Sequence, residues 1–215
     1  MPEALFSNNL WPMLSNKSRL SHWTRENEEI IFATPVYTAY RERYSHPDLN
    51  QGPINFHSIK NRDGVNVIAC DRSSIRESGA QILWVKQFRP AVKSVTLELP
   101  GGTMEDSIPD TLENAKRELL EETGCVADNW IYLGITQSNA GLLRSHLHTY
   151  LALGARSNGA PPTGDGREVF EVEWREFSKR YQGVLNGEAL HSSTLNALAL
   201  LEAQLVEKTS ISQRI

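Results

Sequence analysis

Alternating apolar and polar residues predict a series of β-strands in the first half of the chain. Residues 35–45 alternate and are rich in Tyr, Val and Thr, and residues 54–59 alternate again after the turn-forming residues 46–53. This pattern predicts a β-hairpin. Three further apolar runs have the length of strands, at residues 65–71, 80–88 and 94–102.

One segment, residues 109–124, has the pattern and the end signals of a helix. Ser107, with Asp110 three residues later, predicts a capped start; Pro109 suits the first turn, and Gly124 suits the position after the last turn. Three apolar residues at helical spacing predict a face directed at the core: Leu112, Ala115 and Leu119.

The rest of the chain continues this alternation of strands and helices. Strands are predicted at residues 130–136, 146–155 and 168–174, a loop at 157–166, and a final amphipathic helix at 193–208. The order of elements predicts an α/β fold, a mixed sheet with helices packed on it as a sandwich. Residues 1–30 lack such a pattern and are expected to form an arm. We divide the chain into an N-terminal arm and β-hairpin region, 1–63, and a main domain, 64–215.

Composition narrows the class of protein without identifying it. The 215 residues are 40% hydrophobic and 22% charged, which is typical of a soluble globular protein. A net charge of -4 argues against nucleic-acid binding, and no apolar run is long enough to predict a membrane span, so we expect a cytoplasmic protein. The two cysteines, Cys70 and Cys125, have no metal-site or disulfide spacing, and we expect buried free thiols.

The predicted helix at 109–124 carries a cluster of acidic residues. Glu118, Glu121 and Glu122 stand at i, i+3 and i+4, so their carboxylates share one helix face. Such like charges repel by roughly 0.2–0.5 kcal/mol per pair. A bound cation would reverse that repulsion, and carboxylate oxygens suit Mg²⁺ or Mn²⁺. The alternative is a solvated acidic helix face.

The surrounding sequence resembles the Nudix box: Gly, five residues, Glu, seven residues, then Arg-Glu-apolar-any-Glu-Glu-any-Gly-apolar. Eight residues match it in kind, Gly102, Arg117, Glu118, Leu119, Glu121, Glu122, Gly124 and Cys125. Two departures stand out. The interval from Gly102 to Arg117 is one residue longer than in the pattern, and Pro109 takes the place of the first glutamate. Glu105 or Asp106 is a candidate substitute for that glutamate.

Within the Nudix superfamily the chain from about residue 35 looks nearest the ADP-ribose and nucleotide-sugar pyrophosphatases. Two short motifs carry this resemblance, Gln87-Phe88-Arg89 and Glu98-Leu99-Pro100. It implies a Nudix-type α/β/α sandwich with a mixed sheet, plus an N-terminal β-rich portion that builds a homodimer. It also implies that Arg89 contacts the phosphates or base of the substrate and that Glu98 lies near the metal–phosphate site.

The resemblance implies metal-dependent hydrolysis of a pyrophosphate bond. The expected substrate is a small nucleotide, ADP-ribose or an ADP-sugar, split into a nucleoside monophosphate and a sugar phosphate. Glu118 and Glu122 would be metal ligands, Glu121 a ligand or water-positioning group, and the Gly102 carbonyl a further ligand to Mg²⁺ or Mn²⁺. Arg117 would form an ion pair that orients the glutamates.

The general base is left open by the sequence. In the ADP-ribose enzymes a loop glutamate activates water, but Ser145 occupies that place here. Candidates are Glu168, Glu171, a glutamate of the box, or His146, whose alternative role is that of a partly exposed strand histidine. A metal held by His146 and His148 lacks a third ligand. Because Pro109 and Ser145 depart from the family pattern, a catalytically weak protein that binds or senses a nucleotide sugar is the competing function.

Overall fold

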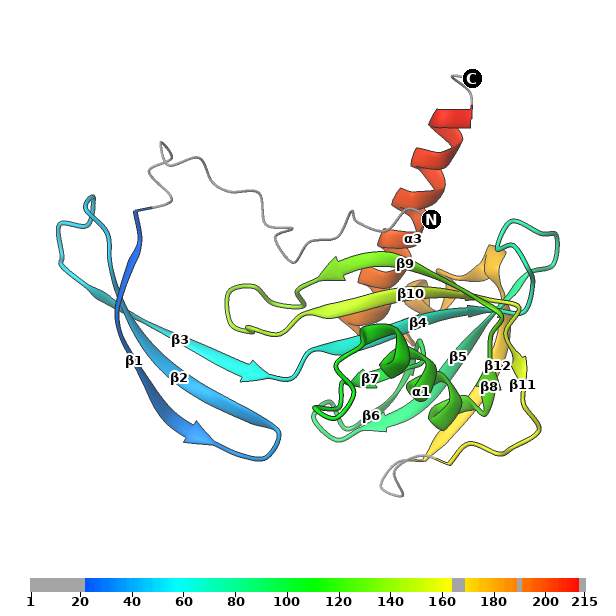
Figure 1. Ribbon diagram of the computed structural model, residues 1–215, viewed down its shortest axis with the longest axis horizontal. Helices are drawn as coiled ribbons and strands as arrows, with labels where there is room; N and C mark the ends of the chain where they lie inside the picture. The colour runs from blue at the N-terminus through cyan, green and yellow to red at the C-terminus, as the bar shows by residue number, and fades with distance from the viewer. Residues whose placement is uncertain (1–21, 164–168, 189–190, 213–215) are drawn as a thin grey trace. The chain divides into compact units, whose positions relative to one another are not determined.

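The computed structural model describes residues 22–163, 169–188 and 191–212, the last six of these for their backbone alone, and is shown in Figure 1. The chain divides into two compact units, Met1–Lys60 and Asn61–Ile215. Each is described by itself below.

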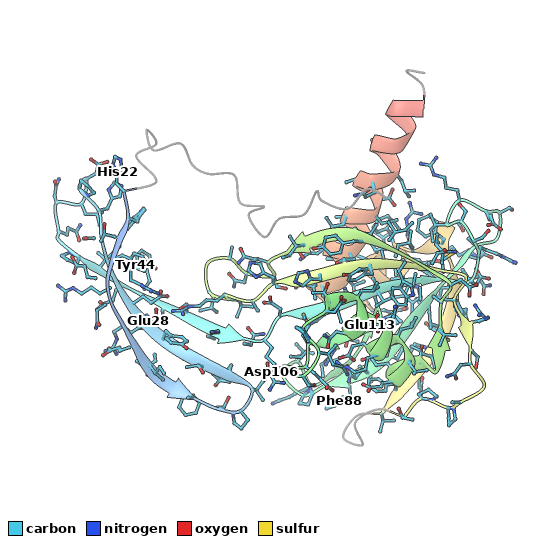
Figure 2. The ribbon with its side chains drawn as sticks, in the orientation of Figure 1. His22, Glu28, Tyr44, Phe88, Asp106 and Glu113 are labelled. Carbon is cyan, nitrogen blue, oxygen red and sulfur yellow. The ribbon has the colours of Figure 1, made fainter. Side chains whose placement is uncertain are left out.

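The first unit contains a three-stranded sheet in its described part, with the order β1 (Thr24–Ala33), β2 (Tyr37–Ser45) and β3 (Ile54–Asn61). The predicted hairpin is confirmed, since β2 and β3 are neighbours joined by residues 46–53. Aromatic rings pack on this sheet, among them Tyr44 (labelled in Figure 2), whose ring meets that of Phe56 edge to face.

The expectation of an arm over residues 1–30 was wrong for β1. Its sequence is strongly polar and does not alternate, but it pairs antiparallel with β2 along most of its length. Opposite charges face each other across this pair, because Arg41 contacts Glu29 at 2.6 Å and Arg43 contacts Glu26 at 3.2 Å. Such cross-strand pairs stabilise a strand that lacks an apolar pattern. Residues 1–21 lie outside the described residues.

The second unit is built on a mixed sheet that has seven strands among the described residues. The central order is β12 (Phe170–Glu176), β5 (Gln81–Arg89), β4 (Gly64–Cys70), β10 (Leu147–Leu153) and β9 (Asn129–Thr136). The β4–β10 pair is parallel and its neighbours are antiparallel. A short pair, β8 (Cys125–Val126) with β11 (Arg156–Ser157), stands apart from it. The predicted strands are thus confirmed, with Glu168 outside the described residues.

The sheet splits in its middle. Strands β4 and β5 pair at Cys70 and Ile82, and beyond that point each has another partner. Strand β6 (Ser94–Glu98) pairs with β5, and β7 (Gly101–Thr103) pairs with β4. The run predicted as one strand at 94–102 therefore forms two strands. The chain crosses between them at Leu99-Pro100, where the Pro100 carbonyl accepts a hydrogen bond from Val67 N at 2.8 Å.

Two apolar cores lie on opposite faces of this sheet. On one face, strand residues pack against Ala197, Leu198 and Leu201 of α3 (Ser192–Ser212). On the other, they pack against Ala115 and Leu119 of α1 (Thr111–Thr123). The predicted sandwich is confirmed, and Figure 1 shows the two helices on either side of the sheet. A 3₁₀ turn, η2 (Phe177–Lys179), and the short α2 (Gln182–Leu185) precede α3. Cys70 and Cys125 are buried free thiols, as predicted.

The ends of α1 differ in part from the prediction. Asp110 is the N-cap residue, and its carboxylate accepts hydrogen bonds from Leu112 N at 2.7 Å and Glu113 N at 3.1 Å. Ser107 instead hydrogen-bonds to Glu105, and Pro109 precedes the cap. A carboxylate one residue before the helix satisfies the first free N–H groups better than a hydroxyl four residues before it. Gly124 ends the helix with φ 65°, as predicted.

Candidate active site

A cavity of about 710 Å³ lies where the sheet of the second unit splits. Its walls come from β4, β6, β7, α1, the segment before β10, and the start of β12 and α3. All the site residues predicted from the sequence line it, namely Arg89, Glu98, Gly102, Arg117, Glu118, Glu121 and Glu122. The fold therefore brings together three short motifs separated in the sequence.

One end of the cavity holds an ion pair between Arg89 and Glu98. Arg89 Nε and Nη2 donate to the two carboxylate oxygens of Glu98, each at 2.8 Å, and Thr96 Oγ1 donates to Glu98 as well. His191 Nδ1 lies 3.6 Å from the same carboxylate. Burial alone would raise the pKa of Glu98, but hydrogen bonds from Arg89 and Thr96 and the charges of His191 and Arg89 lower it overall. Glu98 is thus held ionised.

The three box glutamates of α1 differ in their surroundings. Glu118 and Glu122 are buried, and the Glu121 side chain is more exposed. Arg117 donates at 2.7 Å to both Glu118 and Glu121, and its Nη2 also donates to Thr103 O at 3.2 Å. Burial would lower the pKa of Arg117, but the charges and hydrogen bonds of the two glutamates raise it overall. The ion pairs fix the orientation of Arg117, and its hydrogen bond to Thr103 O joins it to β7.

The glycine pair before α1 leaves room for these carboxylates. A Cβ atom on Gly101 would lie 2.2 Å from Val65 O, so only glycine fits there. A Cβ atom on Gly102 would lie 2.6 Å from Glu118 Oε1. Gly101 N donates to Glu122 Oε2 at 2.9 Å. Gly101 therefore allows the close approach of β7 to β4, and Gly102 leaves room for the carboxylate of Glu118.

The insertion in the altered part of the box carries the two candidate substitutes, Glu105 and Asp106. Glu105 lines the cavity, and its carboxylate lies 3.7 Å from Arg117 Nη1. Asp106, labelled in Figure 2, pairs with Arg62 at 3.0 Å instead. Of the two candidate substitutes for the missing glutamate, Glu105 is therefore the one near Arg117.

The donor set fits a hard divalent cation in kind. Glu118, Glu121 and Glu122 supply carboxylate oxygens and Gly102 a carbonyl, the ligands that Mg²⁺ and Mn²⁺ prefer. Within the described ranges, no group of three or more His, Cys, Asp or Glu side chains is gathered closely enough to hold a metal ion. Glu118 and Glu121 are turned toward Arg117, so they would exchange part of that bonding for the ion.

Some of the candidates for a general base line the cavity and others do not. Ser145 lines the cavity, and its hydroxyl donates to Asn61 Oδ1 at 2.8 Å. His146 lines the cavity too. Glu171 is exposed on β12, where it pairs in register with Lys86, and does not line this cavity. Glu168 lies outside the described residues. Of the named alternatives within the described residues, His146 and the box glutamates are the ones that line the cavity.

Several cavity residues were missed by the sequence analysis. Asn66 Nδ2 donates to Ser193 O at 3.0 Å, which joins β4 to the start of α3 at the cavity wall. The residues missed are Asn66, Ser138, Phe170, His191 and Ser193. None belongs to a motif, and each comes from a segment remote from the box, so sequence spacing gave no signal for them.

A protein-family model and a known sequence each match part of this chain. A family model described as NUDIX domain matches residues 60–186. The chain is 35% identical over 105 residues to a CMP-5'-(N-acetyl-N-hydroxy-3-aminopropyl)phosphonate hydrolase from Streptomyces rubellomurinus (strain ATCC 31215). That match covers 48% of this chain and 50% of the relative, so the chain spans about half the length of this curated relative.

The fold is similar to that of a solved structure. A crystal structure of an ADP compounds hydrolase superposes with a TM-score of 0.72, over 86% of this chain and 95% of that one. The two sequences are 16% identical, so the similarity concerns the fold. No helix in the described part of the chain is long and apolar enough to cross a membrane.

Proposed function

Because the chain belongs to the Nudix family, we propose that it hydrolyses the pyrophosphate bond of a nucleoside diphosphate linked to another group, with ADP-ribose or an ADP-sugar as substrate. The products are a nucleoside monophosphate and a sugar phosphate. One observation carries this proposal: the box glutamates, the glycine pair and the Arg89–Glu98 pair line a single cavity of about 710 Å³. Its size suits a ligand of nucleotide-sugar dimensions.

The box residues hold the metal in this proposal. Glu118 and Glu122 are ligands, Glu121 is a ligand or positions water, and the Gly102 carbonyl adds an oxygen. Mg²⁺ held there, or Mn²⁺ in its place, would supply positive charge to offset that of the diphosphate. Arg117 positions the carboxylates, a role supported by its bonds to Glu118, Glu121 and Thr103.

Arg89 is proposed to contact the substrate, with Glu98 near the metal–phosphate site. Arg89 lines the cavity and carries a positive charge beside a buried carboxylate. We propose that its guanidinium contacts the phosphates or the base, while Glu98 fixes its position. A rigid guanidinium is well suited to phosphate oxygens because its donors lie in one plane.

A CMP-linked phosphonate is the second substrate candidate. The relative from Streptomyces rubellomurinus is named for such a compound, and it shares 35% identity over 105 residues with this chain. The bond cleaved would join two phosphorus centres through oxygen in both cases, so the same carboxylate cluster serves either substrate. The two candidates differ in the base and in the group beyond the second phosphorus.

A substrate panel tests the proposal. Purified protein is incubated with ADP-ribose, ADP-glucose, CMP-linked phosphonates and related nucleotide sugars, with and without Mg²⁺ or Mn²⁺, and the products are separated by chromatography. We expect metal-dependent release of a nucleoside monophosphate from at least one of them. Binding that raises the melting temperature without any turnover would contradict hydrolysis and favour the sensor function instead.

The N-terminal sheet is proposed to build a homodimer in the cytoplasm. Among described residues 22–60 only Glu42 is buried, and several apolar side chains of this sheet are exposed, Ile30, Ile31, Phe32, Val36 and Phe56. Three strands without a covered apolar face are marginal in water, and such patches mark contact surfaces. A second copy of the chain is the occupant that the family resemblance implies.

A further inference from the structure

A histidine and an aspartate form a pair at the cavity wall formed by the segment before β10. Asp63 lies in the turn between β3 and β4, and its Oδ1 accepts a hydrogen bond from His146 N at 2.7 Å. The same oxygen lies 3.6 Å from His146 Nδ1. The His146 carbonyl accepts from Gly64 N at 2.9 Å. The backbone of His146 is therefore fixed on both sides, and its ring is held beside a carboxylate.

Strand register places this pair near the glutamates of α1. Leu147 of β10 pairs with Gly64 of β4, and Gly64 pairs with Thr103 of β7. Neighbouring strands are about 4.8 Å apart, so β10 and β7 are separated by about 10 Å. His146 and the carboxylate of Glu118 flank the same cavity.

The hydrogen-bond network favours one tautomer of His146. With a carboxylate near Nδ1, the ring proton is stabilised on Nδ1. Nε2 then carries the lone pair. The Gln137 side-chain amide nitrogen lies 3.5 Å from it, at the outer limit of a hydrogen bond, and would give way to a water molecule that approaches Nε2. The side chain is 42% exposed and lines the cavity, so a water molecule there can reach the ring. An imidazole oriented by a carboxylate, with its other nitrogen accessible, is the arrangement of a general base.

We propose that His146 is the general base of this site and that Asp63 is its positioning residue. The inference rests on the proposed hydrolysis of a diphosphate. Ser145 and His146 both line the cavity, and of this neighbouring pair His146 is the proton acceptor. The distance of 3.6 Å from Nδ1 to Asp63 is longer than a hydrogen bond, as is common before a substrate binds.

The step balances as a hydrolysis. The oxygen of water forms a bond to one phosphorus of the diphosphate, and one O–H bond of that water breaks. Its proton goes to His146 Nε2, which makes the imidazole cationic, and the charge is stabilised by Asp63. The bond from phosphorus to the bridging oxygen breaks, and its electron pair leaves with the departing phosphate. The proton then passes from His146 to solvent.

Two titratable groups face His146 in the described structure. Asp63 lies 3.6 Å from the His146 ring, and His148, two residues further along the chain, lies 4.0 Å from the other oxygen of Asp63. Gln137 is uncharged. Because a general base acts in its unprotonated form, we expect kcat/KM to fall toward acidic pH.

Variants of the full chain test the assignment with saturating Mg²⁺ and the nucleotide sugar that the wild type hydrolyses fastest. In His146→Gln we expect kcat to fall by about 10²-fold or more, with KM changed by less than about threefold. The fall of kcat/KM toward acidic pH should disappear in this variant. Imidazole added to His146→Ala should restore part of the lost rate. In Asp63→Asn we expect kcat to fall while KM changes by less than about threefold, because a neutral amide no longer holds the ring of His146 beside a negative charge.

His148→Gln is the matched control, since it makes the same change two residues further along the chain, in β10, at a residue that does not line the cavity. It should keep kcat within about threefold. An active wild type with undiminished kcat in His146→Gln would overturn this inference and leave the proposed function standing. A wild type that hydrolyses none of the panel would overturn the proposed function itself. If His146→Gln does not fold, the same measurements on His146→Asn and the imidazole rescue of His146→Ala test the inference instead.

Discussion

At Gly102 the lack of a Cβ atom leaves room for the carboxylate of Glu118. Its backbone lies in β7, and a Cβ atom would come within 2.8 Å of three atoms of that carboxyl group. The carboxylate is the mobile end of a side chain, so it can move aside. A substitution there disturbs the metal ligands more than it disturbs the fold.

Gly102→Ala should therefore lower activity while leaving stability nearly unchanged. We expect kcat to fall by about 10- to 100-fold, since a displacement of about 1 Å at a catalytic group can lower the rate on the order of 10²-fold. The melting temperature should stay close to that of the wild type. Gly141→Ala is the control, because its Cβ position has no neighbour nearer than 3.5 Å. Equal kinetics in the two variants would contradict the assignment of Gly102.

The half-buried His148 should lower the free energy of unfolding at acidic pH. Burial lowers the pKa of His148 below its usual value of about 6.5; Asp63 opposes this and His146 adds to it. The unfolded chain thus binds this proton more readily than the folded chain, so stability is complete above pH 6.5 and declines as the pH falls below it. Urea unfolding between pH 7 and 5 should show a flatter pH dependence in His148→Gln. An unchanged slope would contradict the prediction.

At the scale of elements, α1 serves the core and the site with adjoining parts of one buried face, because Ala115, Glu118, Leu119 and Glu122 stand at helical spacing. Ala115 and Leu119 are fully buried against the sheet, and Glu118 and Glu122 face β7 and its glycines. Asp110 and Gly124 fix the ends of the helix. The positions of the glutamates therefore depend on the packing of their apolar neighbours.

Leu119 and Leu120 are adjacent on α1 but differ in burial. Substituting each in turn therefore distinguishes the contribution of core packing from that of helix propensity. Leu119→Ala removes a side chain with no exposed surface and should lower the free energy of unfolding by about 2–5 kcal/mol. Leu120 is 38% exposed, and Leu120→Ala should lower it by less than about 1 kcal/mol. Equilibrium urea unfolding measures both. Similar losses in the two variants would show that Leu119 does not anchor the helix.

The apolar patterns predicted the strands and helices of the second unit well because each element packs one face or both against a core. They failed where charged pairs or backbone geometry, rather than apolar burial, determine the strand. Strand β1 is held by charged cross-strand pairs, and the split between β6 and β7 follows from Pro100 and the glycine pair. The true cap, Asp110, was weighed as the second residue of a capping pair, since a carboxylate and a hydroxyl give similar signals in sequence.

The candidate site was predictable to the extent that its residues lie close together in sequence. Glu118, Glu121 and Glu122 fall within a single helical turn, so spacing alone places them on one face. His191 and Phe170 reach the same cavity from distant segments, and their approach depends on the whole topology. The Asp63–His146 pair joins residues 83 positions apart through the parallel pairing of β4 with β10.

At the scale of the molecule, the described site belongs entirely to the second unit, and the exposed apolar sheet belongs to the first. If that sheet forms the proposed dimer, charge on it should separate the copies. Ile30 is 62% exposed, and Ile30→Lys should shift the mass measured by light scattering from dimer toward monomer. Asn27→Lys is the control, because it adds the same charge at an exposed polar position of the same strand. A monomeric wild type would contradict the dimer.

The central claim is that the carboxylates of α1 catalyse hydrolysis of a diphosphate. The most direct test compares the turnover of wild type and Glu122→Gln with a nucleotide sugar and Mg²⁺, with melting curves to verify folding. We predict a folded variant whose kcat is lower by on the order of 10²-fold or more, because a neutral amide replaces a buried negative oxygen donor. Near-normal turnover by Glu122→Gln would contradict the account.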